Sequence, residues 1–101
     1  MSGFEHQFEW DPKKAVENLR KHGISFETGA TIFLDPLART IPDPDHSETE
    51  ERWISIGHAS NGQMLLVIHT WQDLSPSSAR VRIISARPAN RAEIHEYEEH
   101  Q

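Results

Sequence analysis

With 101 residues, the chain is long enough for one domain, expected to span residues 1–101, and leaves no room for a second core. It contains no cysteine, which excludes disulfides and thiolate metal sites, and no apolar run near the roughly 20 residues that cross a bilayer, so we expect a cytoplasmic protein without membrane contact. A net charge of −6 argues, taken alone, against a nucleic-acid partner.

The first third of the chain predicts one strand and two helices. Apolar and polar residues alternate from Phe4 to Trp10, which is typical of a strand. Asp11 followed by proline marks a helix start, and Gly23 marks its end. Ser25 can cap a second, short helix that runs through Phe33.

The rest of the chain predicts four strands and a final helix. Asn61-Gly62 between two apolar runs is a strong hairpin signal, and the polar segment 72–79 is expected to be a loop. The expected elements are strands at 37–41, 53–59, 64–71 and 80–87 and a helix from Asn90 to about Tyr97. The order β-α-α-β-β-β-β-α predicts an α+β fold in which two N-terminal helices and one C-terminal helix pack on an antiparallel sheet.

Alternation within the strands predicts an open, cationic face. Trp53, His69, Arg80 and Arg82 are expected to share it, so that aromatic rings could contact bases and guanidinium groups could contact phosphates. Eight of the ten lysines and arginines fall in two segments, 13–21 and 80–91, which would join into a basic patch if the fold brought them together. Ordinary solvated faces are the alternative.

Five blocks of the sequence, in order and with similar spacing, resemble the BrnT toxins. They are FEWDPKKAVENLRKHGISFETGATIF, DPLA, IPDPDHSETEERWISIG, LLVIHT and RVRIISARPANRAEIHEYEE. The resemblance implies a RelE-like fold, endoribonuclease activity that inhibits translation and needs no metal or other cofactor, and neutralisation by a ribbon-helix-helix antitoxin of the BrnA type. It also implies a heterotetramer with an antitoxin dimer, in which only the antitoxin contacts DNA.

RNA cleavage needs an acid or base and a cation at the phosphate. Arg82 and Arg87 match the RIISAR motif of the family and are the candidate phosphate clamps, with His22 and His69 as candidate acid–base groups. Arg87 could instead pair with a glutamate near the C-terminus, His22 could simply stabilise a helix end, and His69 could be a half-buried strand residue. The candidate RNA-binding residues are Lys14, Lys21, Trp53, Arg80 and Tyr97.

Three further features leave the activity open. Asp43, Asp45 and His46 are close in sequence but match no metal-site spacing, and their loop could instead dock a basic antitoxin helix. Residues 71–79 replace a tight, arginine-containing turn of the family, and Ala92, Ile94 and His95 stand where the final helix of the family is basic. The alternative function is therefore a weakened or non-catalytic homologue that binds the antitoxin and tunes repression of its own operon.

Overall fold

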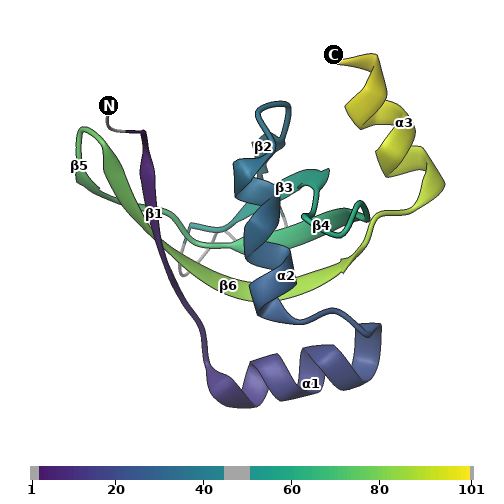
Figure 1. Cartoon of the computed structure of the whole chain (residues 1–101), viewed down its shortest axis with the longest axis horizontal. Helices are drawn as coiled ribbons and strands as arrows, with labels where there is room; N and C mark the ends of the chain where they lie inside the picture. The colour runs from purple at the N-terminus through teal and green to yellow at the C-terminus, as the bar shows by residue number, and fades with distance from the viewer. Residues whose placement is uncertain (1–2, 45–50, 101) are drawn as a thin grey trace.

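A twisted sheet of six strands carries three α-helices in this computed structural model, which describes residues 3–44 and 51–100 (Figure 1). The strands are β1 (Glu5–Glu9), β2 (Arg39–Pro42), β3 (Trp53–His58), β4 (Met64–His69), β5 (Gln72–Ser75) and β6 (Ser78–Pro88). The helices are α1 (Pro12–His22), α2 (Phe26–Ala30), followed by the short 3-10 helix η1 (Thr31–Leu34), and α3 (Arg91–Glu99). The predicted α+β class is confirmed. No helix in the described ranges is long and apolar enough to cross a membrane.

Local capping signals in the sequence account for the helix boundaries. The Asp11 carboxylate accepts a hydrogen bond from the Lys13 N–H (2.8 Å) at the start of α1. Gly23 ends that helix with φ of 71°, a left-handed conformation that favours glycine. Asn90 and Glu93 form the predicted capping box of α3, each side chain binding the backbone N–H of the other. The expected single helix from Ser25 to Phe33 is instead divided between α2 and η1.

The sheet differs from the prediction in two ways. The strands run in the order β1-β6-β4-β3-β2, and β1 pairs with β6 in parallel, so the sheet is not purely antiparallel. This pairing joins the two ends of the chain, which strand alternation cannot reveal. Part of the expected loop 72–79 forms β5, which pairs with the start of β6. All four residues of β5 are exposed, so no apolar alternation marks it as a strand.

One face of the sheet is covered by helices and holds the core. Leu65, Val67, Val81, Ile83 and Ala86 point from β4 and β6 to this covered face, where they pack with Phe26, Ile32 and other buried residues. The large side chains there are almost fully buried, and each such burial contributes about 1.5–3 kcal/mol. The covered face therefore supplies most of the stability.

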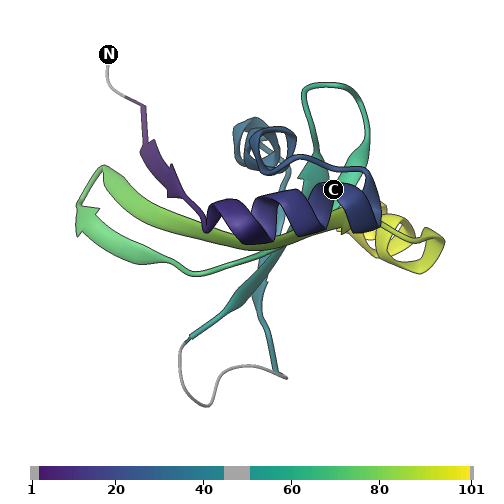
Figure 2. The same ribbon diagram turned by 90° about the horizontal axis from the view of Figure 1, so that it is seen from below.

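Two polar side chains complete the edges of the sheet where a neighbouring strand is missing. Beside the second half of β6, which α1 flanks in Figure 2, the Asn18 side chain donates to the Ala86 carbonyl (2.7 Å) and accepts from the Ala86 N–H (3.1 Å). Just before the start of β2, the Asp35 carboxylate accepts from the backbone N–H of His58 (2.8 Å). Both side chains satisfy backbone groups that would otherwise lack partners at an edge.

Candidate functional site

The opposite face of the sheet, here called the open face, carries a row of four residues with arginine at each end. Strand register places Arg87 beside Leu66, Leu66 beside Ile56, and Ile56 beside Arg39. Residues paired in this way share one face of a sheet. The row therefore sets two guanidinium groups on either side of an apolar centre.

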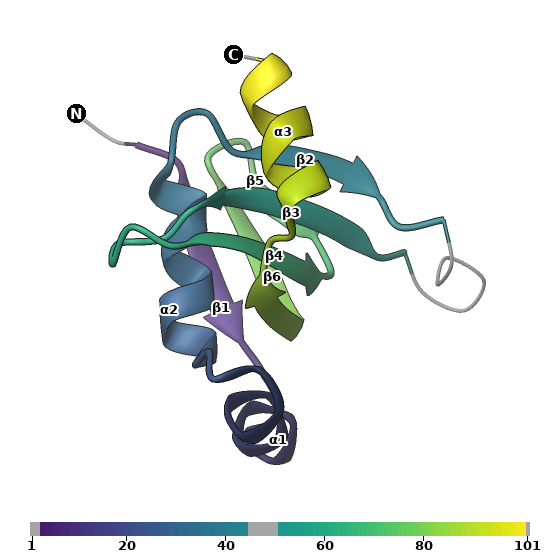
Figure 3. The same ribbon diagram turned by 90° about the vertical axis from the view of Figure 1, so that its right-hand side faces the viewer.

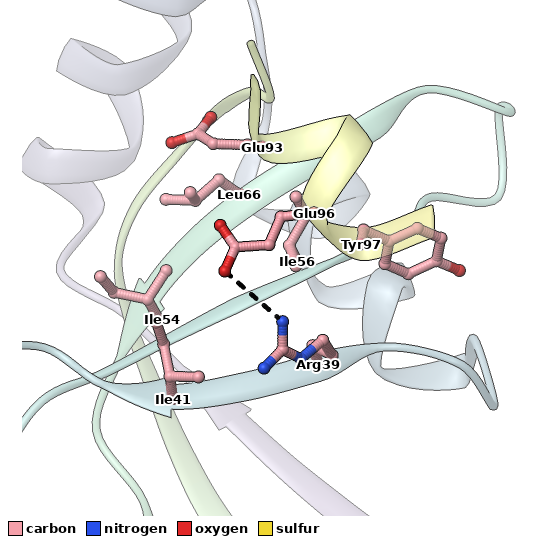
Figure 4. A pocket seen from close by; sticks show the side chains of 8 residues that line it. All are labelled: Arg39, Ile41, Ile54, Ile56, Leu66, Glu93, Glu96 and Tyr97. Atoms are coloured by element: carbon pink, nitrogen blue, oxygen red, sulfur yellow. Dashed lines mark ion pairs between the residues drawn. The ribbon is translucent and has the colours of Figure 1, made fainter. Parts of the chain in front are cut away.

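α3 lies over this row and turns it into a groove of about 250 Å³. Figure 3 shows α3 in front of β2 and β3, and Figure 4 shows the groove from close by. Its lining residues are Arg39, Ile41, Ile54, Ile56, Leu66, Glu93, Glu96 and Tyr97. The floor is aliphatic, and the charged groups stand at the rim.

The glutamates of α3 hold the arginines of the row. Glu93 binds Arg87 through both carboxylate oxygens, at 2.8 and 2.9 Å, and Glu96 lies 3.9 Å from Arg39. The hydrogen bonds with Arg87 lower the pKa of Glu93, and those with Glu93 raise the pKa of Arg87. The sequence prediction that Arg87 could pair with a glutamate near the C-terminus is confirmed. Glu93 and Glu96 lie three positions apart, so they project from one side of the helix.

The other two arginines of β6 alternate away from the core and extend the open face toward β1. Arg80 contacts Glu9 (3.7 Å) and donates to the Gln72 side chain (3.2 Å). Arg82 lies opposite Glu9 in the β1–β6 register. The open face is thus cationic along β6, as predicted, with acidic side chains interspersed.

The prediction that Trp53 and His69 share the face of Arg80 and Arg82 is wrong. Cross-strand register pairs Trp53 with His69, and His69 with the core residue Ile83, so these rings belong to the covered face. Which side of β6 shares a face with His69 depends on cross-strand register, which alternation within each strand does not show. The imidazole of His69 is fully buried, contacts the Ser55 hydroxyl (2.7 Å) and the Thr70 carbonyl (2.9 Å), and has a pKa lowered by burial.

The predicted site residues of α1 lie at the side of the sheet. Lys14 and Lys21 are exposed and His22 is partly exposed, on a helix that flanks β6 through Asn18 (Figure 2). The eight described residues that line the groove include none of these three. The fold therefore places these α1 residues along one edge of the sheet, outside the groove with Arg39.

Three side chains form a hydrogen-bonded cluster at the groove: Asp35, His58 and Tyr97. Of these, only Tyr97 was identified from the sequence. The Tyr97 hydroxyl donates to Asp35 (2.7 Å) and lies 3.3 Å from Nδ1 of His58. Burial and the hydrogen bond to Asp35 raise the pKa of Tyr97 to about 12, so it stays protonated. The pKa of Asp35 is lowered because hydrogen bonds from His58, Leu37 and Tyr97 outweigh the opposing effect of burial. The DPLA block held Asp35, but only the fold brings it to Tyr97.

Two of the three potential metal-binding side chains of the acidic loop, Asp45 and His46, lie outside the described residues. In residues 3–44 and 51–100, no group of three histidine or carboxylate side chains is arranged to hold a metal ion.

Comparison with known proteins finds a matching family and similar solved structures. A family model described as the ribonuclease toxin BrnT of type II toxin–antitoxin systems matches residues 10–93. The crystal structure of the Brucella abortus ribonuclease toxin BrnT, solved at 1.1 Å resolution, aligns with 86% of this chain and 99% of its own, with a TM-score of 0.59 and 22% sequence identity. No curated protein matches the chain. At this identity, the structural match supports the shared fold alone.

Proposed function

Because the chain belongs to the BrnT family of ribonuclease toxins of type II toxin–antitoxin systems, we propose that it cleaves RNA on the open face of its sheet. The observation that carries this proposal is the row that runs from Arg87 through Leu66 and Ile56 to Arg39. A guanidinium group can bind two phosphate oxygens at once, and it stays charged at every physiological pH. The apolar floor between them offers a surface for ribose and base.

The arginines supply the charge stabilisation that cleavage needs. The 2′-hydroxyl of RNA attacks the adjacent phosphorus in line with the departing 5′-oxygen, and negative charge grows on the phosphoryl oxygens. We assign Arg87 and Arg82, the sequence candidates, and Arg39, which only the fold reveals, to the phosphates. Arg80 extends the same cationic strand.

RNA must compete with the glutamates of α3 for these arginines. A phosphate approaching Arg87 replaces a bidentate carboxylate, and one approaching Arg39 displaces the weaker Glu96 contact. We therefore expect modest RNA affinity that falls with salt.

The internal nucleophile makes a metal unnecessary for this reaction. Since the 2′-hydroxyl belongs to the substrate, the enzyme need not activate water, and we expect cleavage to continue at an unchanged rate in excess EDTA. A loss of cleavage on chelation, restored by a divalent cation, would contradict this part of the proposal.

Arginine variants test the open face directly. In Arg87→Ala and Arg39→Ala, we expect cleavage of single-stranded RNA to fall by at least about tenfold. Arg20→Ala is the matched control, because Arg20 is exposed on α1 and pairs with Glu17 three residues earlier in the same helix. Growth arrest on expression without antitoxin should follow the same ranking. Intact RNA after incubation with the unaltered protein would refute the ribonuclease function.

The partner proposed for the toxin is a ribbon-helix-helix antitoxin of the BrnA type in the cytoplasm. Such antitoxins are dimers, so we expect a heterotetramer in which the antitoxin alone contacts DNA. Light scattering of the copurified complex gives its mass, and a ratio other than two toxins to two antitoxins would contradict this stoichiometry.

A second candidate function is antitoxin binding without catalysis. The observation that favours it is that Glu93 and Glu96 occupy both arginines at the ends of the row. In that case, expression without antitoxin leaves growth and RNA unchanged, while the toxin still tightens binding of the antitoxin to operator DNA in a gel-shift assay.

A further inference from the structure

We propose that His58 is the acid–base residue of RNA cleavage, and that Asp35 and Tyr97 orient its ring. This inference rests on the ribonuclease function proposed above. It adds a proton-transfer group to an open face whose other proposed residues are arginines, which stay protonated.

The hydrogen bonds in the cluster determine which nitrogen of His58 can accept a proton. Tyr97 donates its hydroxyl proton to Oδ2 of Asp35 (2.7 Å), so its oxygen is left as an acceptor for His58. Nδ1 of His58 lies 3.3 Å from that oxygen and 3.6 Å from the carboxylate. Two acceptors on this side favour a proton on Nδ1, which leaves the lone pair on Nε2. Asp35 is held in turn by the backbone N–H groups of Leu37 and His58.

Burial divides the cluster into a fixed part and an accessible part. The side chain of Asp35 is 9% exposed and Tyr97 is buried, whereas the side chain of His58 is 54% exposed. An accessible imidazole oriented by a buried carboxylate is the arrangement that general acid–base catalysis uses. His69, by contrast, is fully buried.

His58 lies close to the end of the groove that Arg39 forms. Arg39 pairs with Ile56, and His58 follows Ile56 by two residues on the same face of β3. Arg39 and His58 are therefore diagonal neighbours, whose Cα atoms are typically about 7–8 Å apart. The hydroxyl of Tyr97 points away from Ile41 and Ile54 in Figure 4, and its contacts place it beside Asp35 and His58. Beside His58 is a hollow of about 210 Å³ lined by Thr31, Leu34, Asp35, His58, Ala59 and Ser60. A phosphate on Arg39 would bring the adjoining ribose toward His58.

In this step His58 acts as the base, and water protonates the leaving oxygen. Nε2 of His58 takes the proton of the 2′-hydroxyl, and the oxygen electron pair forms the new bond to phosphorus. The bond from phosphorus to the 5′-oxygen breaks with its electron pair on that oxygen, which takes a proton from water. The products are a 2′,3′-cyclic phosphate and a 5′-hydroxyl, and the imidazolium then returns its proton to solvent.

The test compares single-turnover cleavage of a short single-stranded RNA by the full chain and three variants. In His58→Ala, we expect a loss of about 100-fold or more, with RNA affinity within about twofold of the unaltered protein. Added imidazole should restore part of the rate in His58→Ala, because it can enter the space left by an exposed ring. In Tyr97→Phe, we expect a smaller loss in the cleavage step with little change in RNA affinity, since Tyr97 is a positioning residue. His95→Ala, exposed on α3, should leave the rate unchanged.

A pH profile separates proton transfer from a structural role. The rate of the unaltered protein should depend on pH as general-base catalysis does, and this dependence should be absent in His58→Ala. A rate in His58→Ala within about threefold of the unaltered protein, or a loss that imidazole does not restore, would overturn the assignment while leaving the ribonuclease function intact. Failure of the unaltered protein to cleave RNA would overturn both.

Discussion

The polar side chains on the two faces of the sheet are paired in different ways. On the covered face, the polar side chains are neutral and satisfied by one another, as in the contacts of His69 with the Ser55 hydroxyl and of Ser55 with Thr40 (2.7 Å). On the open face, charges are paired across a groove, where Glu93 and Glu96 reach Arg87 and Arg39. Neutral pairs tolerate burial, whereas charged pairs lose too much hydration to be buried cheaply.

Because of this difference, substitutions that affect folding stability and substitutions that affect RNA cleavage are expected to fall on different faces. Substitutions on the covered face remove packing or leave buried groups unpaired, so they are expected to act through unfolding. Substitutions on the open face replace partly exposed charge pairs, whose contribution to stability is small, so they are expected to act through RNA. Each of the following experiments asks whether the two faces keep to these roles.

The largest effect is expected for Phe26→Ala on the covered face. Phe26, the first residue of α2, is fully buried, and truncating a buried phenylalanine costs about 3–5 kcal/mol of unfolding free energy. Val16→Ala on the exposed side of α1 is the control and should cost less than about 0.5 kcal/mol. Urea denaturation followed by tryptophan fluorescence measures both. Equal losses in the two variants would show that the core does not lie where the structure places it.

We expect Asn18→Ala to lose about 2 kcal/mol of unfolding free energy, because it leaves buried backbone groups of β6 without hydrogen-bond partners. The side chain contacts the Ile24 carbonyl (2.9 Å) as well as both backbone groups of Ala86. Hydrogen exchange should show faster exchange of the Ala86 amide, with little change in β3. If the Ala86 amide remains protected in this variant, Asn18 is not its hydrogen-bond partner.

Local signals in the sequence predicted the elements well, because each depends on residues that are neighbours in the chain. The Asp11 cap, the end of α1 at Gly23 and the hairpin at Asn61-Gly62 are of this kind. The parallel pairing of β1 with β6 was missed, since no local pattern encodes it. β5 was missed because both of its faces are exposed.

The site was harder to predict than the elements, because its residues meet only through long-range register. Arg39 was overlooked since nothing in its own strand distinguishes it, yet the register links it to Arg87 through two intervening strands. Asp35 lies 62 positions from Tyr97, so their hydrogen bond leaves no signal in a single sequence. Alternation within β4 correctly groups His69 with Leu65 and Val67, but only cross-strand register shows that Ile83, and not Arg82, shares their face.

A pH-dependent loss of stability is the third expected effect, and it belongs to the covered face. Burial lowers the pKa of His69 and, in the same aromatic cluster, that of His6. The unfolded chain therefore binds protons more readily than the folded one. The contribution of these neutral histidines to the unfolding free energy is fully present above the unfolded histidine pKa of about 6.5 and falls as the pH drops below it.

Unfolding free energies at several pH values between 5 and 8 measure this dependence. His69→Leu is expected to be less stable at pH 8 but to lose less on acidification. His95→Gln, exposed on α3, should follow the unaltered protein. The carboxylates Asp35 and Glu93 have lowered pKa values, so their contributions are lost only at more acidic pH. A dependence that His69→Leu leaves unchanged would assign the effect to another group.

The smallest effect on stability, and the most informative one about RNA, is expected for Glu93→Gln. Glutamine can still accept from the Asn90 N–H and keep the capping box, but it loses the bidentate charge pair with Arg87. Since both side chains are partly exposed, we expect a cost below about 1 kcal/mol. RNA affinity should rise several-fold at low salt, because a phosphate no longer competes with a carboxylate for the guanidinium.

Fluorescence anisotropy with a labelled RNA at two salt concentrations measures that affinity, with Glu98→Gln on exposed α3 as the control for net charge. An equal gain in both variants would reduce the effect to overall charge. Weaker RNA binding in Glu93→Gln would mean that Glu93 orients Arg87 for its phosphate rather than competing with it. In that case the charge pair of the open face would be preorganisation, and the separation between the two faces would be less complete than their burial suggests.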